Sequence, residues 1–478
     1  MILMDQAIGK KIAKNAAWLF GGQIVGRLLR AVIIIYAARF LGAGGWGAFS
    51  YALSLAAFLT IFSDFGVNAL LTREGVKSPE LRNKYLATAL ALKASVLVVL
   101  MAVVTLFADR LTSIPAVVAL LPIISLIFAF DSLRDLGVAL ARSLEKMEIE
   151  AWVNIITNLS ITVFGFMFLY SFGTVASLTW GYALGSGLGL LAIIYILRDY
   201  FRGLWGYIDL SLAKSLITSA WPFGLLGLMG VVMINTDVLM LGWLTSAEAT
   251  GFYAAAQRPI QLLYIAPALI AAAFFPALTR SVKNRDPHFR AIFERGVVAT
   301  YLLAVPIAIG GFLLARPIMQ LLYGSVYLPG TSSFAILALT TLAVFPAAII
   351  ANGVYAHDKQ KNLLGYVALG IGGNILLNFL LIPILGIAGA AISTFINQII
   401  INVYLWRRFK KVSDFSILPH LNKIVTAGLI MGVFTLLMKH YSVNVIGNIA
   451  LSGALYLIFL WILKEPMLRM LNKSKQTN

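Results

Sequence analysis

The sequence contains no cysteine, and it has only four histidines among its 478 residues. The missing cysteine excludes disulfides, thiolate metal sites and cysteine nucleophiles. Each histidine falls in an expected loop or at an expected helix end, so histidine chemistry deep inside an apolar bundle is not expected. The four positions are His288, His357, His420 and His440. We therefore expect no metal site and no enzyme activity.

Two further absences concern energy and loop length. The phosphate-binding pattern G-x-x-x-x-G-K-[ST] does not occur, so ATP binding through such a loop is not expected. The gaps between apolar stretches, such as 171–174 and 245–250, are short, so no soluble domain of about 50 residues fits between them. Function must therefore reside in the apolar bundle, without a cofactor. Energy must come from an ion gradient or from consumption of a product.

Apolar sequence is what the chain has in abundance. Apolar residues make up 60% of it, and its mean hydropathy is +0.90. They fall into about fourteen stretches of roughly 20 residues, each long enough to cross a ~30 Å hydrocarbon core as a helix. The sequence therefore predicts an all-α polytopic membrane protein with about 14 transmembrane helices.

The net charge of +18 is confined to alternate gaps between these stretches. This is the positive-inside pattern. It predicts a multi-pass protein of the cytoplasmic (inner) membrane with both termini in the cytoplasm. Orientation thus explains the basic balance, and no nucleic-acid partner is expected. The amino-terminal stretch is expected to stay as an uncleaved anchor, with residues 2–8 lying along the inner interface. The inner clusters lie at 10–14, 73–84, 142–146, 198–214, 280–295, 359–361, 407–411 and 464–475, and the opposite gaps hold almost only Arg110, Arg316 and Lys439.

The expected spans divide the chain into two lobes and a tail. Residues 1–205 form an N-lobe of helices 1–6, residues 206–411 a C-lobe of helices 7–12, and residues 412–478 hold helices 13–14 and a cytoplasmic end. The spans are 15–41, 46–72, 84–108, 114–141, 147–170, 174–197, 212–244, 251–279, 292–315, 330–356, 362–382, 386–406, 419–438 and 443–463.

Two sequence correspondences predict that the lobes are internal repeats. The segments 40–52 and 243–256 share a pattern of aromatic, glycine and alanine residues, and so do 154–176 and 374–389. Both lie about 200 to 220 residues apart. Because each half has an even number of helices, the repeats would be parallel and related by an axis along the membrane normal.

A small set of ionisable residues falls inside the expected spans, where each costs roughly 2.5–3.5 kcal/mol at the membrane centre. Gln23, Arg27 and Arg30 share one helix face by their spacing. Two arginines one turn apart suit a diphosphate, which the guanidinium fork binds bidentately. The alternative is a pair of structural salt bridges to Asp64 or Asp237. Arg39 lies near the outer end of the first span, where its side chain is expected to extend to the membrane interface.

The remaining deep charges allow two kinds of role. Asp131, Arg134 and Asp135 are spaced for ion pairing on one helix, while Lys93 lies alone on the third span. Neither Asp64 nor Asp237 has an obvious ion-pair partner on its own span. Each is therefore a candidate either for holding a proton or Na⁺ or for balancing neighbouring arginines.

The eighth span carries a further candidate at Gln257-Arg258-Pro259. The proline frees a backbone carbonyl and bends the helix, which suits a ligand site or gate. Pro222 and Pro267 are further candidate hinges. A pair of asparagines, Asn374 and Asn378, is expected to mediate close interhelical packing.

Three segments resemble a known family. The stretch AARFLGAGGWGAFSYALSLAAFLTIFSDFGVNALLTRE (37–74) closely resembles the opening signature of the polysaccharide-transporter family within the multidrug/oligosaccharidyl-lipid/polysaccharide exporter superfamily. The stretch 236–280 resembles its second-half counterpart, and LIPILGIAGAAIST (381–394) its later glycine-rich turn. The resemblance implies two six-helix lobes around a central cavity, two extra helices, and flipping of a polyprenyl-linked oligosaccharide.

Three functions compete at this stage. A flippase, working as a monomer on a lipid-linked oligosaccharide, needs a cationic cavity and short outer loops. A cation-coupled drug exporter of the same superfamily should favour acidic cavity residues, whereas the spans hold six basic and four acidic candidates. A membrane glycosyltransferase or polymerase needs a sizeable outer loop, which the sequence lacks. The flippase is favoured.

Overall fold

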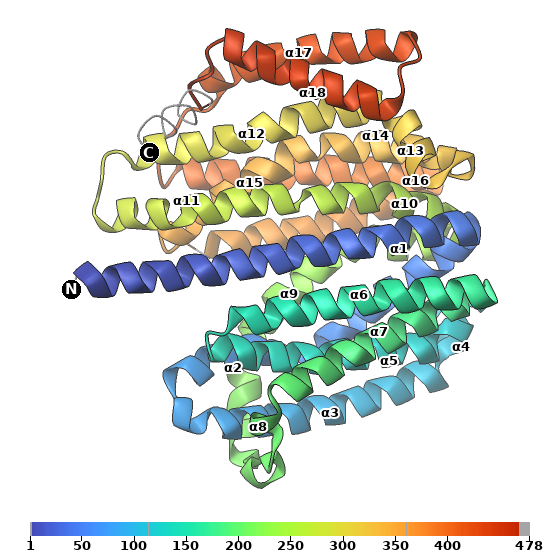
Figure 1. The fold of residues 1–478 in the computed structure, drawn as a ribbon, viewed down its shortest axis with the longest axis vertical. Coiled ribbons are helices and arrows are strands. Elements are labelled where there is room, and N and C mark those ends of the chain that lie inside the picture. Colours follow the sequence, from blue (N-terminus) through green and yellow to red (C-terminus); the bar gives the residue numbers. More distant parts are fainter. Residues whose placement is uncertain (1, 113, 360, 468–478) are drawn as a thin grey trace. The chain divides into compact units, whose positions relative to one another are not determined.

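The computed structural model describes residues 2–112, 114–359 and 361–467, and in that part of the chain every regular element is a helix (Figure 1). The expected all-α class is confirmed. The chain divides into two compact units, Met1–Gly251 and Phe252–Asn478.

The first unit is built from nine α-helices and two short 3-10 helices. In chain order these are α1 (Ile2–Asp64), α2 (Val67–Lys77), η1 (Pro79–Leu81), α3 (Arg82–Leu106), α4 (Ala108–Leu111), α5 (Pro115–Ser143), α6 (Met147–Phe172), α7 (Val175–Ile196), α8 (Arg198–Phe201), η2 (Leu204–Tyr207) and α9 (Leu210–Leu244). Helix α10 (Ala247–Leu263) begins in this unit and continues into the second.

The second unit ends in a two-helix hairpin, α17 and α18. Its elements are α11 (Ile265–Lys283), α12 (Phe289–Leu313), α13 (Ala315–Tyr323), η3 (Ser325–Gly330), α14 (Thr331–Leu339), α15 (Thr341–Ala356), α16 (Lys361–Lys410), α17 (Leu418–His440) and α18 (Val445–Ile462). Its core is an aromatic and aliphatic cluster in which Phe293 packs against Phe409 and Phe415.

Ten helical segments among the described residues are long and apolar enough to cross a membrane. A helix satisfies its backbone hydrogen bonds internally, which is why apolar runs of this length fold this way in hydrocarbon. The expected count of fourteen stays a prediction. The segments are 79–106, 115–143, 147–172, 175–196, 247–283, 289–313, 325–356, 363–410, 418–440 and 445–462.

Two long helices contain sharp breaks at glycine. Gly42 in α1 has φ 68° and ψ 177°, and Gly386 in α16 has φ 56° and ψ −132°. These backbone angles are open mainly to glycine. Gly42 lies in the gap expected between the spans 15–41 and 46–72, and Gly386 is the first residue of the span expected at 386–406. The turns expected there are therefore present, although the helices run on through them.

Three spans expected to be continuous are broken in the structure. Phe65 and Gly66, with φ of 39° and 86°, separate α1 from α2. Tyr264 separates α10 from α11, where Pro267 removes the N–H that would have bonded to the carbonyl of Leu263. Thr340 separates α14 from α15; its hydroxyl donates to the carbonyl of Leu337, a bond of the kind that bends helices. The expected lead-in at 2–8 continues α1 as a helix.

Glycines let α6 and α7 pack unusually closely in the first unit (Figure 1). Gly181, Gly185 and Gly189 recur every fourth residue on α7, and a Cβ at any of them would lie within 3 Å of α6 atoms. This small-residue spacing is what allows helix backbones to approach in a membrane. Helix α6 packs on α1 as well, so α1 is fixed from one side.

A reciprocal contact joins the second half of α1 to the start of α10. A Cβ at Gly47 would lie 1.7 Å from the carbonyl oxygen of Ala247, and a Cβ at Gly251 would lie 1.9 Å from that of Ala43. Gly47 and Gly251 are 204 residues apart in the sequence, and so are Ala43 and Ala247. A parallel repeat would produce such symmetry, and the repeat itself stays a prediction. So does the lobe boundary at 205–206, since α9 packs on α1, α2 and α3.

Candidate functional site

The candidate diphosphate site begins with one face of α1. Gln23 and Arg30 are half-buried and Arg27 is exposed. Neither arginine forms an ion pair with a carboxylate among the described residues. The Nε atom of Arg30 is buried without a hydrogen-bond partner there. In the described part of the chain, the positive charge on this face is therefore not neutralised by an acidic side chain.

Polar side chains of α6 fix the neighbouring face of α1. The Nδ2 of Asn154 donates to the carbonyl of Gly22 at 3.1 Å, and the hydroxyl of Thr162 donates to the carbonyl of Leu29 at 3.0 Å. Gly26 faces the amide of Asn158, which would lie 2.8 Å from a Cβ there. Bonds to helix carbonyls set the rotation of α1. The arginines are thereby held on a face adjacent to this contact.

An aromatic ring of α7 supports Arg30. Its guanidinium carbon lies 5.8 Å from the ring centroid of Tyr182, which is itself buried. A cation over an aromatic face at this distance is stabilised without losing its charge. The ring therefore orients Arg30 while leaving its hydrogen-bond donors for a ligand.

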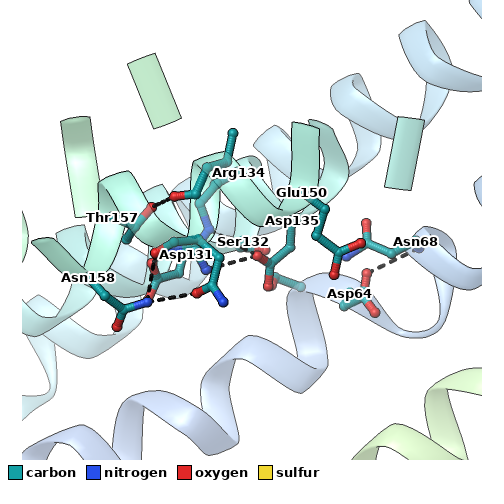
Figure 2. A network of polar contacts seen from close by, with 12 residues as sticks. Asp64, Asn68, Asp131, Ser132, Arg134, Asp135, Glu150, Thr157 and Asn158 are labelled. Carbon is teal, nitrogen blue, oxygen red and sulfur yellow. Dashed lines mark hydrogen bonds and ion pairs between the residues drawn. The ribbon is translucent and has the colours of Figure 1, made fainter. Parts of the chain in front are cut away.

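Asp64 lies beside a lysine at the junction of α1 and α2. The Nζ of Lys93 in α3 lies 3.2 Å from Oδ1 of Asp64 and donates to Oδ1 of Asn68 at 3.0 Å. The same Asp64 oxygen accepts the backbone N–H of Asn68 at 3.2 Å, as Figure 2 shows. Asp64 therefore balances Lys93 rather than the arginines of α1.

The charges on α5 form the ion pairs that their spacing predicts. The Nη1 of Arg134 lies 2.6 Å from Oδ1 of Asp131, and its Nη2 lies 2.9 Å from Oδ1 of Asp135. Figure 2 shows these residues together with Ser132, whose hydroxyl lies 2.7 Å from that of Ser63. This group joins α5 to the end of α1.

Asp237 and Arg39 occupy contrasting environments in the first unit. Asp237, in α9, is 2% exposed, beside the buried Thr236. Arg39 is exposed near the end of the first predicted span. A carboxylate buried this deeply requires compensation by nearby positive charge or hydrogen bonds.

The remaining basic candidate lies in the second unit. Arg258 is half-buried in α10, and its Nη1 donates to Oε1 of Gln261 at 3.2 Å, while Gln257 is buried. Burial raises the pKa of Tyr323 in α13, and the positive charge of Arg258 opposes that shift. Arg258 thus belongs to a polar region with Gln261 and Tyr323. Whether it meets the arginines of α1 stays a prediction.

Three residues that interact with the candidate site residues were not predicted from the sequence: Asn68, Tyr182 and Tyr323. Asn68 is four residues after Asp64, so helical spacing alone pointed to it. Tyr182 and Tyr323 gave no such signal, because each meets its arginine from another helix. Among the described residues no group of three His, Asp or Glu side chains is placed to hold a metal ion.

Comparisons with known proteins identify the family of the chain. The family model described as a polysaccharide biosynthesis protein matches residues 12–282. AglR of Haloferax volcanii, described as a probable flippase, is 22% identical over 84% of either chain. The capsular polysaccharide biosynthesis protein CapF of Staphylococcus aureus is 20% identical over 84% of this chain and 100% of its own.

Solved structures share the fold. The lipid II flippase MurJ in an inward closed conformation superposes with a TM-score of 0.79 at 20% identity, over 94% of this chain and 99% of its own. An inward-facing multidrug transporter of the MATE family gives 0.66 at 14% identity, over 81% and 95%. The resemblance inferred from the segments at 37–74 and 236–280 is confirmed, and the chain belongs to the polysaccharide biosynthesis protein family.

Proposed function

We propose that this chain is a flippase that moves a polyprenyl-diphosphate-linked oligosaccharide across the cytoplasmic membrane by alternating access. Arg27 and Arg30 carry the proposal, because they lie one turn apart with no carboxylate partner among the described residues. A diphosphate offers paired acceptor oxygens for two such forks. Membership of a polysaccharide biosynthesis family supports the class of substrate.

Gln23 adds a polar group on the same face of α1 as the two arginines. Gln257 and Arg258 of α10 are proposed separately as residues that bind the same substrate. Both termini lie in the cytoplasm, as the positive-inside pattern requires. The protein acts as a monomeric carrier, not as an enzyme.

The distribution of paired charge separates the flippase from a drug exporter. MATE transporters share the fold, but a carrier of cationic drugs needs free acidic groups. Here Asp64 pairs with Lys93, and Asp131 and Asp135 pair with Arg134. The deep acids of these pairs are neutralised while the arginines of α1 are not, so the site favours an anionic substrate.

Transport is coupled to a cation through Asp237. This carboxylate is buried, so a proton or Na⁺ there would change the charge of the unit interior and bias two conformations that differ by a few kcal/mol. A free cation at Asp64 would have to compete with Lys93, which lies within ion-pairing distance.

Accessibility tests the location of the arginines. Cysteine placed at 27 or 30 in this cysteine-free chain should react with a membrane-impermeant thiol reagent, because arginines serving a water-filled cavity contact water. Cysteine at the exposed outer position 110 is the labelling control. Failure of both positions to react, while position 110 reacts, would contradict the cavity assignment.

Transport tests the function itself. Liposomes carrying the wild-type chain should translocate a fluorescent polyprenyl-diphosphate oligosaccharide, and Arg27→Ala with Arg30→Ala should lower the rate by tenfold or more, at about 1.4 kcal/mol per tenfold. Arg110→Ala, which removes an exposed arginine, is the matched control. Equal rates for the double variant and the control would show that these arginines do not bind the substrate.

A further inference from the structure

The junction of α1, α2 and α3 has the composition of a small-cation site. It presents the carboxylate of Asp64 and the amide oxygen of Asn68 to one point, about halfway along α3. Oxygen ligands of this kind suit hard monovalent cations such as Na⁺. In this structure the point is taken by the ammonium group of Lys93.

The ammonium group of Lys93 is covalently attached to the chain and therefore acts as a fixed cation at this point. Its side chain is 1% exposed, and its Nζ lies 3.2 Å from Asp64 and 3.0 Å from Asn68. An ammonium that is buried this deeply must be compensated by nearby charge and hydrogen bonds. Asp64, by contrast, is 35% exposed, so its carboxylate is not enclosed by the protein on every side.

Surrounding charge favours a cation at this point. The negative charge of Asp135 in α5 also attracts the ammonium group of Lys93, in addition to the charge of Asp64. Asp131 and Asp135 share the single charge of Arg134. Counted over these five side chains, the group has one more negative than positive charge, so removing the lysine would leave an electronegative pocket.

We infer that Lys93 is a built-in substitute for a free monovalent cation, and that the Asp64–Asn68 site would bind Na⁺ if the lysine were absent. The wild-type chain therefore takes no free cation at this site. The inference concerns the site alone and does not depend on which lipid the protein carries.

Replacing the ammonium tests the inference. Lys93→Met keeps an unbranched apolar side chain as far as the ε position and removes the terminal ammonium group. In purified protein at constant ionic strength, exchange of choline chloride for about 100 mM NaCl should raise the Tm of Lys93→Met by about 1–3 °C, because a ligand that binds only the folded state stabilises it. The Tm of wild type should not respond.

Two further variants make the result specific. Lys93→Arg keeps a cation and should not respond to Na⁺. Lys93→Met with Asp64→Asn removes the carboxylate as well and should lose the response. A Na⁺ effect of equal size in wild type, or its survival in the double variant, would overturn the inference. A Lys93→Met chain that Na⁺ neither stabilises nor rescues from misfolding would overturn it too, because the open site should then accept the ion.

Discussion

At the scale of single residues, Arg30 contacts an aromatic ring through its guanidinium group and has a buried Nε that donates no hydrogen bond within the described residues. Tyr182 lies 5.8 Å from its guanidinium carbon, and the buried Nε has no hydrogen-bond partner among the described residues. A buried donor left unsatisfied costs about 1–3 kcal/mol. A substrate that accepts from it would recover that energy, which favours binding of an anion here.

The geometry of this site predicts different outcomes for two substitutions. Arg30→Ala should reduce glycan export at least tenfold at unchanged membrane abundance. Arg30→Lys should restore only part of it, because a point charge loses the bidentate fork and the stacking on Tyr182. Export measured in cells, with abundance determined by immunoblot, checks this. Full export by the alanine variant, or complete rescue by lysine, would mean that the planar fork is not used.

A second residue-scale pair bears on stability rather than transport. Arg142 donates through Nε and Nη2 to the two carboxylate oxygens of Glu150 at 2.6 and 2.5 Å, and Glu150 is 8% exposed. Arg142→Met should lower stability by about 1–3 kcal/mol, because it leaves a buried carboxylate unpaired, although the half-exposed arginine limits the loss. Thermal unfolding in detergent measures the change. Arg142→Met with Glu150→Met should recover most of it, and a double variant less stable than the single one would refute this interpretation.

The sequence predicted these residues better than their partners. Charges inside apolar runs are visible without a structure, and the spacing of Asp131, Arg134 and Asp135 was enough to predict their ion pairs. The pair of Asp64 with Lys93 was missed because it joins different helices. Packing between helices has no short-range signature in the chain.

At the scale of elements, helix ends followed from local chemistry where glycine or proline marks them. The break at Gly42 lies in the predicted gap between two spans, and the break at Gly386 lies at the predicted start of a span. The break at Phe65–Gly66 lies inside a span that was predicted to be continuous, although Gly66 and the polar Asp64 and Asn68 are there. The predicted spans therefore had the right composition, but some of them are broken by turns that were not predicted.

The glycine contact between α1 and α10 yields an element-scale prediction. Gly47→Ala should destabilise the protein by about 1–3 kcal/mol, because its Cβ would lie 1.7 Å from the carbonyl oxygen of Ala247. Gly44→Ala is the control on the same helix, since nothing lies within 4 Å of a Cβ there. It should be neutral or stabilising by up to about 1 kcal/mol. Equal Tm values for the two variants would show that the helices do not cross closely at Gly47.

At the scale of the whole molecule, the proposed transport combines an anion site on α1 with a coupling role for Asp237. If Asp237 couples transport, Asp237→Asn should make the flipping rate insensitive to an imposed proton or Na⁺ gradient, because the amide cannot exchange charge. Proteoliposomes with each gradient applied separately provide the measurement. Wild-type flipping that is equal with and without every gradient would limit Asp237 to structural charge balance.

The central claim is that the carrier moves an anionic lipid-linked glycan. One competition measurement tests it most directly, with proteoliposomes containing both a fluorescent polyprenyl-diphosphate oligosaccharide and a cationic dye. If the substrate is the anionic lipid-linked glycan, the glycan lipid should change leaflet at a rate that depends on Arg27 and Arg30. The dye should stay in the compartment into which it was loaded. Protein-dependent movement of the dye, with the glycan lipid left in its original leaflet, would contradict the claim.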